Sequence, residues 1–409
     1  MNAGKSDGLV AGYLELGLAT GRHIDGFVDA YYGPPETMSR ISAEPVRPPE
    51  RLVHDARALV SEIDAGAALE ASSHAGDTAS DASRRRWLRA QVVGILTTAR
   101  KLAGEDIAYA DEVEACYGVR PHPVEWDEVA EAHKRLESAV PGNGSLAERV
   151  SAWREAHAVD PAKLLGAIEA LAEDLLERTD RLFGVPDDAR CDFELVTDKP
   201  WSGFNTYLGG LRSRVDINTD LPVLSLSLPH LVAHEAYPGH HTEHTRKEVG
   251  LVRNRKWLEE TIFLVGTPQC LLAEGLADLG LSVVMGDRYE QIVAPHFRSL
   301  GIRYDADVAA EVSEASQLLS SVRATAAWRL HAEGVEPEQV VSELERWALL
   351  SHARAEKAVE FLLHPTWRAY ITCYVEGYAL CRKFVGGDPT RFARLLNEQL
   401  IPADLAEAA

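Results

Sequence analysis

The stretch LPHLVAHEAYPGHHTEH contains five histidines and two glutamates in seventeen positions. Two histidines one helical turn apart, about 6 Å along the axis, can bind one metal ion, and a glutamate beside the first can accept a proton from water on that ion. His234 and Glu235 begin this H-E-x-x-H pattern, but Pro238 stands where the second histidine belongs, and histidines return only at His240 and His241. The stretch therefore predicts a metal site with a bend built into it, or a histidine-rich helix end that binds no metal.

The bend determines which histidine is the second ligand. Pro238 disfavours helical geometry at the residue before it, and Gly239 tolerates the backbone angles that follow. In a straight helix His240 would lie about 120° around the axis from His234, and a bend can bring it back. His241 would face the right way in a straight helix, but about 10 Å further along. We predict His240 as the second ligand and keep His241 as the alternative.

Two other interpretations of this stretch remain open. His230 and His234 are one turn apart without a bend, although that pair explains neither the Pro-Gly dipeptide nor the later histidines. Histidines also favour helix C-termini, where they need no metal. His244 lies a further turn along, and we expect its side chain to be exposed.

A third ligand is expected on the next helix. LLAEGLADLG places Glu274 among leucines, and Gly275 and Ala277 would let that helix approach a metal site closely. A buried carboxylate needs a partner, which a metal ion would supply. Asp278, one turn beyond Glu274, can accept the free N–H of a ligating histidine. Glu376 in YVEGYALC has a similar Glu-Gly setting and is the competitor for the third position.

These residues fit the chemistry of a hydrolase. A hydrolytic zinc site has three protein ligands and one position open for water, with a carboxylate nearby to take the water's proton. We predict Glu235 as that general base. Tyr370, Tyr374 and Arg382 follow in a later helix and offer an oxyanion donor or an anchor for a carboxylate. Of these, Tyr374 belongs to the predicted catalytic set.

The motifs resemble a known family. HEAYPGHH, followed by AEGLADLG, is similar to the bacterial domain-of-unknown-function family 885, whose hallmark is H-E-A-x-P-G-H-H with a downstream E-G-W-A-L-Y. That family is grouped with gluzincin-type metallopeptidases, and the match spans roughly residues 190–400. The resemblance implies zinc held by His234, His240 and Glu274, with Glu235 as base.

The sequence departs from this family at two places. Glu243 stands where the family has glutamine, and Leu276 and Leu279 replace the aromatic residues of the second motif. Asp278 stands in place of a leucine. These changes concern the substrate pocket more than the metal ligands.

The elements that must position these residues are mostly helical. We predict a mainly α fold with a small β-sheet (α+β), in which a zincin-like core is embedded in helices. The chain is divided into a helical N-terminal region (1–190), the core with its sheet and active-site helices (191–300), and a helical C-terminal region (301–409). DPAKLLGAIEALAEDLLERTDRLFG illustrates the helical pattern, because Asp160 can cap it and Pro161 suits its first position.

Period-two alternation predicts the sheet just before the histidines. Phe193 and Leu195 alternate in one predicted strand, and SRVDINTDLPVLSLSL continues the pattern through Val215 and Ile217 to its last leucines. Between them, WSGFNTYLGGLR has the glycines of a turn. By analogy with gluzincins, the SRVDIN strand is expected to pair with an extended substrate backbone.

The composition limits the partners and the compartment. The 409 residues carry a formal charge of −21, which repels nucleic acid phosphates and anionic membranes. Five scattered cysteines without a C-x-x-C pair indicate reduced thiols. The first residues do not resemble a secretory signal, and no uninterrupted apolar run reaches the roughly 18 residues of a membrane span. We therefore expect a cytoplasmic protein that binds neither nucleic acid nor membrane; its oligomeric state is left open.

The predicted function is that of a zinc metallopeptidase-like hydrolase that cleaves short peptides. Two alternatives are a metal-dependent hydrolase acting on a non-peptide amide or ester, and a non-catalytic helical binding protein. Retention of Glu235 favours an enzyme, because a purely structural metal site has no use for a general base.

Overall fold

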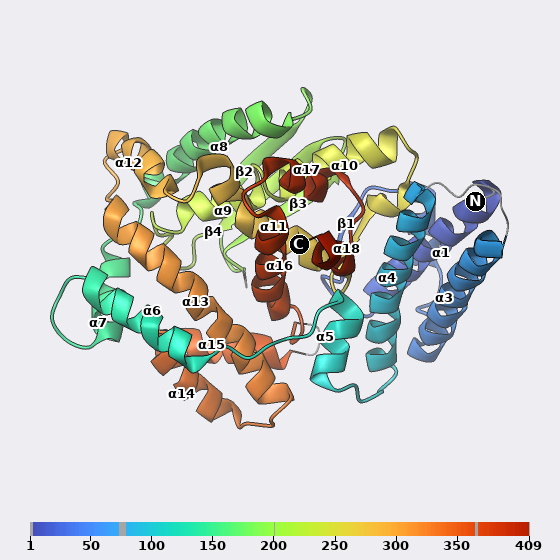
Figure 1. The fold of residues 1–409 in the computed structure, drawn as a ribbon, viewed down its shortest axis with the longest axis horizontal. Coiled ribbons are helices and arrows are strands. Elements are labelled where there is room, and N and C mark those ends of the chain that lie inside the picture. Colours follow the sequence, from blue (N-terminus) through green and yellow to red (C-terminus); the bar gives the residue numbers. More distant parts are fainter. Residues whose placement is uncertain (1–2, 73–78, 200, 365–366, 409) are drawn as a thin grey trace.

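The computed structural model describes residues 3–72, 79–199, 201–364 and 367–408. The fold is mainly α with a small β-sheet, as the sequence predicted, and it has a second sheet of two strands (Figure 1). Helix α11 (Pro268–Met285) lies at the centre, and nearly all of its side chains are buried. Within the described ranges, α11 alone is long and apolar enough to cross a membrane, but 83% of it is buried inside the protein. This helix therefore serves here as the core helix of a folded chain.

The N-terminal part is helical apart from one short strand. Helices α1, α3 and α4 pack side by side at one end of the molecule (Figure 1). The elements before the larger sheet are α1 (Ala3–Gly21), β1 (Val28–Tyr31), α2 (Pro35–Ala43), α3 (Pro49–Ser72), α4 (Ala79–Leu102), α5 (Tyr109–Tyr117), α6 (Trp126–Ala139), α7 (Leu146–Glu155) and α8 (Pro161–Phe183). The start of α8 is as predicted, because Asp160 accepts a hydrogen bond from Ala162 N and Pro161 opens the helix.

The larger sheet comprises β2 (Arg190–Val196), β3 (Gly203–Gly209) and β4 (Arg212–Asn218) in the order β2-β4-β3. Strand β4 pairs parallel with β2 and antiparallel with β3. The predicted alternation is confirmed in β2 and β4, which pair Phe193 with Val215.

Two expectations about the sheet were wrong. The segment expected to be a turn is largely strand β3; Phe, Thr and Tyr favour strands, and only the Gly-Gly pair at its end makes the turn. The leucine alternation after β4 does not continue the strand. Leu224 makes one isolated bridge, and Leu228 already begins a helix that Pro229 opens.

A second sheet of two strands was not predicted. Strand β1 pairs antiparallel with β5 (Ile262–Leu264), so the N-terminal region is joined to the segment just before α11. Both strands are too short to show a clear period in the sequence.

The helices that follow the larger sheet surround α11. They are α9 (Leu228–Glu235), α10 (His240–Lys247), η1 (Glu248–Arg253), η2 (Leu258–Thr261), α12 (Tyr289–Ser299), α13 (Ala306–His331), α14 (Pro337–Trp347), α15 (His352–Leu363), η3 (Cys373–Gly377), α16 (Tyr378–Val385), α17 (Pro389–Asn397) and α18 (Pro402–Ala408). Asp305 caps the start of α13 and Pro337 opens α14, whereas η3 is a π-helical stretch that the helical pattern did not reveal.

Three apolar clusters hold these elements together. One packs the first helices against β5, and a second packs α8, the larger sheet and α9 against the end of α11. The largest joins α5 to α7 with α11 and the C-terminal helices. The division at residues 190 and 300 stays a prediction about domains.

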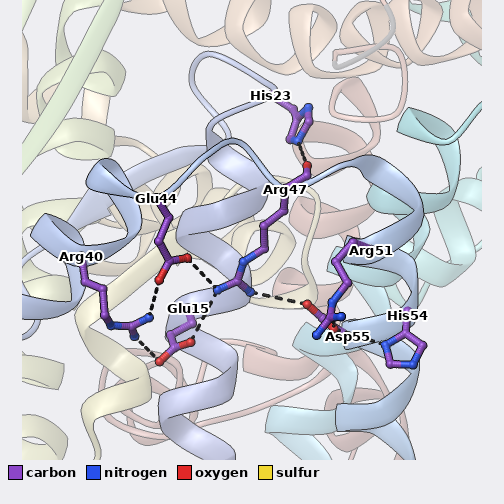
Figure 2. A network of polar contacts seen from close by, with 8 residues as sticks. All are labelled: Glu15, His23, Arg40, Glu44, Arg47, Arg51, His54 and Asp55. Atoms are coloured by element: carbon purple, nitrogen blue, oxygen red, sulfur yellow. Dashed lines mark hydrogen bonds and ion pairs between the residues drawn. The ribbon is translucent and has the colours of Figure 1, made fainter.

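Ion pairs link the N-terminal helices on the surface (Figure 2). Arg47 lies between three carboxylates, 3.8 Å from Glu15, 3.3 Å from Glu44 and 3.5 Å from Asp55. Arg40 pairs with both glutamates. Exposed pairs contribute about 0–1 kcal/mol each, so this network orients α2 and α3 on α1 more than it stabilises them.

A second polar network is buried beside α10. Lys247 Nζ donates to Glu243 Oε1 at 2.6 Å, and Gln399 Nε2 donates to Glu260 Oε1 at 2.9 Å. Burial raises the pKa of Glu260 to about 7, against the opposing effect of the Lys247 charge. Glu243, which departs from the family pattern, thus pairs with a lysine on its own helix.

Candidate metal centre

The histidine stretch is bent as the sequence predicts. Helix α9 ends at Glu235 and α10 begins at His240. A Cβ at Gly239 would lie 1.9 Å from the carbonyl oxygen of His234, so no other residue fits there. Gly239 N donates to Ala233 O at 2.9 Å, which closes the bend.

The bend brings three predicted ligands together. His234 Nε2 lies 3.1 Å from His240 Nε2 and 3.4 Å from Glu274 Oε2, and His240 Nε2 lies 3.5 Å from Glu274 Oε1. Ligands about 2.0–2.1 Å from a tetrahedral zinc ion are separated by about 3.3 Å. The three side chains therefore have the spacing and donor types that zinc prefers, and they form a group able to hold a metal ion.

Glu274 lies on α11 and is buried. Tyr370 donates a hydrogen bond to its Oε1 at 3.0 Å, whereas Oε2 has no hydrogen-bond partner. Burial alone would raise the pKa of Glu274, but the imidazoles of His234 and His240 lower it well below its usual range. An ionised, buried carboxylate with an unsatisfied oxygen is suited to binding a cation.

Asp278 orients the first histidine. Its Oδ1 lies 2.8 Å from His234 Nδ1, so an N–H there directs the lone pair of Nε2 toward His240 and Glu274. Asp278 also lies 3.4 Å from His230 Nε2, and these residues form a second possible metal group that shares His234. A metal ion held by His234, His240 and Glu274 would leave Asp278 free to support His234. A metal ion in the second group would need Asp278 itself as a ligand.

Glu235 is the last residue of α9 and is 6% exposed. Within the described part of the chain, its carboxylate makes no hydrogen bond or ion pair. Burial raises its pKa, although the charges of His234 and His240 oppose this. A carboxylate that is held in the site without a structural partner is available to exchange a proton.

The sheet edge next to Glu235 belongs to β3. A Cβ at Gly203 would lie 3.1 Å from Glu235 Oε1. The expectation that substrate pairs with the SRVDIN strand is wrong, because that strand is β4 and both of its edges are already paired. Strands β2 and β3 are the two edges of this sheet, and β3 is the edge that lies next to Glu235.

Helix η3 packs directly on α11. A Cβ at Gly275 would lie 2.3 Å from the carbonyl oxygen of Gly377, which explains the small residue after Glu274. This contact brings Tyr374 close enough for the charges of Glu274, Asp278 and Glu235 to raise its pKa, in addition to the larger effect of burial. The rings of Tyr370 and Tyr374 meet edge to face with centroids 5.4 Å apart.

The alternative ligands lie elsewhere. His241 Nδ1 contacts Ser213 Oγ at 2.8 Å on β4, and Glu376 accepts a hydrogen bond from His122 N at 3.1 Å. Arg382 stacks on Tyr378. His244, which was expected to be exposed, is buried against the ring of Tyr207.

One residue near the site was missed by the sequence reasoning. Asp29 on β1 lies close enough to His240, Glu274 and Glu235 for their charges to affect it, and burial raises its pKa to about 7. Within the described ranges it has no hydrogen-bond partner. It is far from the motifs in the sequence, and the contacts of β1 with β5 and β3 bring it near them.

No family model and no curated protein matches the chain. Among solved structures, a protein from Colwellia psychrerythraea provisionally called a lipoprotein has a TM-score of 0.55 and 16% identity over 93% of this chain and 80% of that one. A similarly described protein of unknown function from Shewanella oneidensis has a TM-score of 0.46 and 13% identity, covering 90% of this chain and 74% of that one. Metallocarboxypeptidase 1 from Trypanosoma cruzi has a TM-score of 0.49 and 13% identity, covering 98% and 94%. The first similarity indicates a shared fold and nothing about activity.

Proposed function

We propose that the protein is a zinc-dependent hydrolase, and specifically a metallopeptidase that acts on short peptides. The observation that supports this most strongly is the convergence of His234, His240 and Glu274 at 3.1–3.5 Å beside an unpartnered Glu235. A site with only a structural role would leave that buried carboxylate without a partner at a cost in stability. The HEAYPGHH resemblance supports the same function.

Each residue of the site has a role in peptide hydrolysis. A bound zinc ion would lower the pKa of its water to about 7 and polarise the substrate carbonyl. Glu235 accepts the water's proton as the carbon–oxygen bond forms, and it delivers a proton to the leaving nitrogen as the carbon–nitrogen bond breaks. Tyr374 donates a hydrogen bond to the carbonyl oxygen as it gains charge. Asp278 and Tyr370 hold His234 and Glu274 in place.

The substrate backbone is expected to lie along β3. Strand β3 begins at Gly203, where the absence of a side chain leaves room for Leu231 and Glu235 to pack against the strand, so this sheet edge lies next to the proposed base. Backbone hydrogen bonds would then bind peptides of many sequences, with little discrimination by side chain.

Metal content and turnover test the proposal together. We expect about one zinc ion per purified chain, retained in Glu235→Gln and in the control Glu376→Gln, and lost in His240→Ala and Glu274→Ala. Turnover of a short-peptide library should fall by about 10²- to 10⁴-fold in Glu235→Gln and stay unchanged in Glu376→Gln. Zinc binding with normal turnover in Glu235→Gln would exclude this mechanism. Cleavage of esters or non-peptide amides without any peptide cleavage would exclude the peptidase.

A further inference from the structure

Asn205 on β3 donates a hydrogen bond to the backbone of the proposed base. Its Nδ2 lies 2.6 Å from the carbonyl oxygen of Glu235, and the residue is only 5% exposed. A carbonyl oxygen can only accept, so this contact fixes the orientation of the amide, with its nitrogen toward Glu235. Asn205 is therefore a buried donor that holds Glu235 from a different element of the fold.

The contact belongs to a strand that spans the bend. Alternate residues of a strand point to the same face, and on β3 one face carries Gly203, Asn205 and Tyr207. Gly203 packs against the side chain of Glu235, and Asn205 bonds to its carbonyl, both at the end of α9. Tyr207 stacks on His244 of α10, with ring centroids 4.7 Å apart. Strand β3, which is itself paired with β4, thus contacts the chain on both sides of the break.

The carbonyl of Glu235 has no other hydrogen-bond donor among the described residues. It belongs to the last turn of α9, where the helix itself offers no N–H. Gly239 N, which closes the bend, donates to Ala233 O at 2.9 Å instead. Because the Glu235 carboxylate has no hydrogen-bond partner in those residues either, the bond from Asn205 is the polar contact that fixes Glu235 from outside its own helix.

The oxygen of the same amide is unpaired. Asn205 Oδ1 is buried and has no hydrogen-bond partner within the described chain. A buried acceptor left in this way costs stability, so an apolar side chain of similar size would suit the sheet about as well. Choices that lower stability in this way are expected at functional sites. The favourable contact of the amide is with Glu235, which indicates that Asn205 serves the base more than the sheet.

We propose that Asn205 is a positioning residue for Glu235. The proposal rests on the proposed function, in which Glu235 accepts and delivers the proton. By holding the carbonyl at the end of α9, Asn205 fixes the backbone from which the carboxylate projects. A general base must lie within hydrogen-bond reach of the proton that it takes, and a misplacement of about 1 Å can reduce turnover by about 100-fold. Asn205 acts through Glu235, so its loss should lower kcat while substrate binding is kept.

The test replaces Asn205 by leucine, which has a similar size but no hydrogen-bonding group, and by glutamine, which keeps the amide. In Asn205→Leu, kcat for short peptides should fall by about 10- to 100-fold, with KM within about threefold of the wild type. Asn205→Gln should recover part of this loss. Both variants should keep about one zinc ion per chain and the urea midpoint of the wild type.

The matched control is Asn397→Leu. Asn397 Nδ2 on α17 also donates to a backbone carbonyl at 2.6 Å, that of Ala393, and its removal should leave kcat unchanged. An equal fall of kcat in the control would overturn the proposal, as would a kcat of Asn205→Leu within about twofold of the wild type. An Asn205→Leu protein that unfolds, or that loses zinc in parallel with kcat, would show a structural role and would also overturn it.

Crystal structures of the zinc-loaded proteins separate this proposal from the proposed function. In Asn205→Leu, the Glu235 carboxylate should be displaced by about 1 Å or more, or spread over several conformers, whereas His234, His240 and Glu274 should superimpose on the wild type. Such a displacement would support the positioning role even if no peptide were cleaved. A Glu235 carboxylate that is unchanged in position and order would overturn it even in an active peptidase.

Discussion

Replacing Asp278 by asparagine keeps the shape of the side chain but removes the negative charge that faces His234. The carboxylate lies 2.8 Å from His234 Nδ1, and this bond directs Nε2 toward the other two ligands. Asparagine can still accept a hydrogen bond, but it increases the basicity of the imidazole less. We therefore expect Asp278→Asn to weaken zinc binding without removing the site.

The magnitude follows from the burial of the pair. Exposed pairs contribute about 0–1 kcal/mol, whereas hydrogen bonds to charged groups out of solvent contribute about 1.5–3 kcal/mol. The side chains of His234 and Asp278 are only 11% and 16% exposed, so the second range applies. A loss of this size corresponds to a zinc dissociation constant that is about 10- to 100-fold higher.

Competition with a chromophoric chelator measures this change. The matched control is Asp174→Asn, which alters an aspartate 3.2 Å from His296 Nε2 in a pair between α8 and α12. The control should bind zinc as tightly as the wild type. Zinc affinity of Asp278→Asn within twofold of the wild type would refute the supporting role, as would an equal loss in the control.

Three further predictions concern the bend and the buried network. His240→Ala should abolish stoichiometric zinc binding, measured by elemental analysis, whereas His241→Ala should retain it. Gly239→Ala should lower the free energy of unfolding in urea by at least about 3 kcal/mol, because the new Cβ would lie 1.9 Å from a backbone oxygen. The control Gly250→Ala, which has open space around its Cβ, should leave the free energy of unfolding unchanged. The pKa of Glu260 is raised to about 7, so its contribution to stability is full below its unfolded value of 4.5 and is lost as the pH rises toward 7. The free energy of unfolding of Glu260→Gln in urea, relative to that of the wild type, should therefore rise by about 3 kcal/mol between pH 4.5 and 8. A difference between the two proteins that stays constant over this pH range would contradict the prediction.

The sequence predicted the local features of the site because local physics determines them. The position of Pro238 and Gly239 predicts the break between α9 and α10, and the small Gly275 after Glu274 predicts a close helix contact. These features depend on residues that are adjacent or one helical turn apart. The choice between His240 and His241 needed the geometry of the bend, and the structure places only His240 beside His234.

The remaining features arise from contacts between distant segments. Asp29 reaches the site because β1 contacts both β5 and β3, and no pattern around it indicates such contacts. Strand β3 was taken for a turn because its glycines are visible in the sequence, whereas its pairing with β4 is not.

The two close backbone contacts explain how the site keeps its geometry. At Gly239 the chain folds back on the carbonyl of His234, and at Gly275 helix α11 touches the carbonyl of Gly377. The first contact sets the two histidines relative to each other, and the second sets η3 and its tyrosines relative to Glu274. Because neither contact involves a metal ligand's side chain, the polypeptide itself positions the ligands. Folding of the chain thus arranges the ligands before a metal binds, whereas a small zinc-dependent domain is ordered only by its metal. Little of the free energy of zinc binding is then needed to order the site.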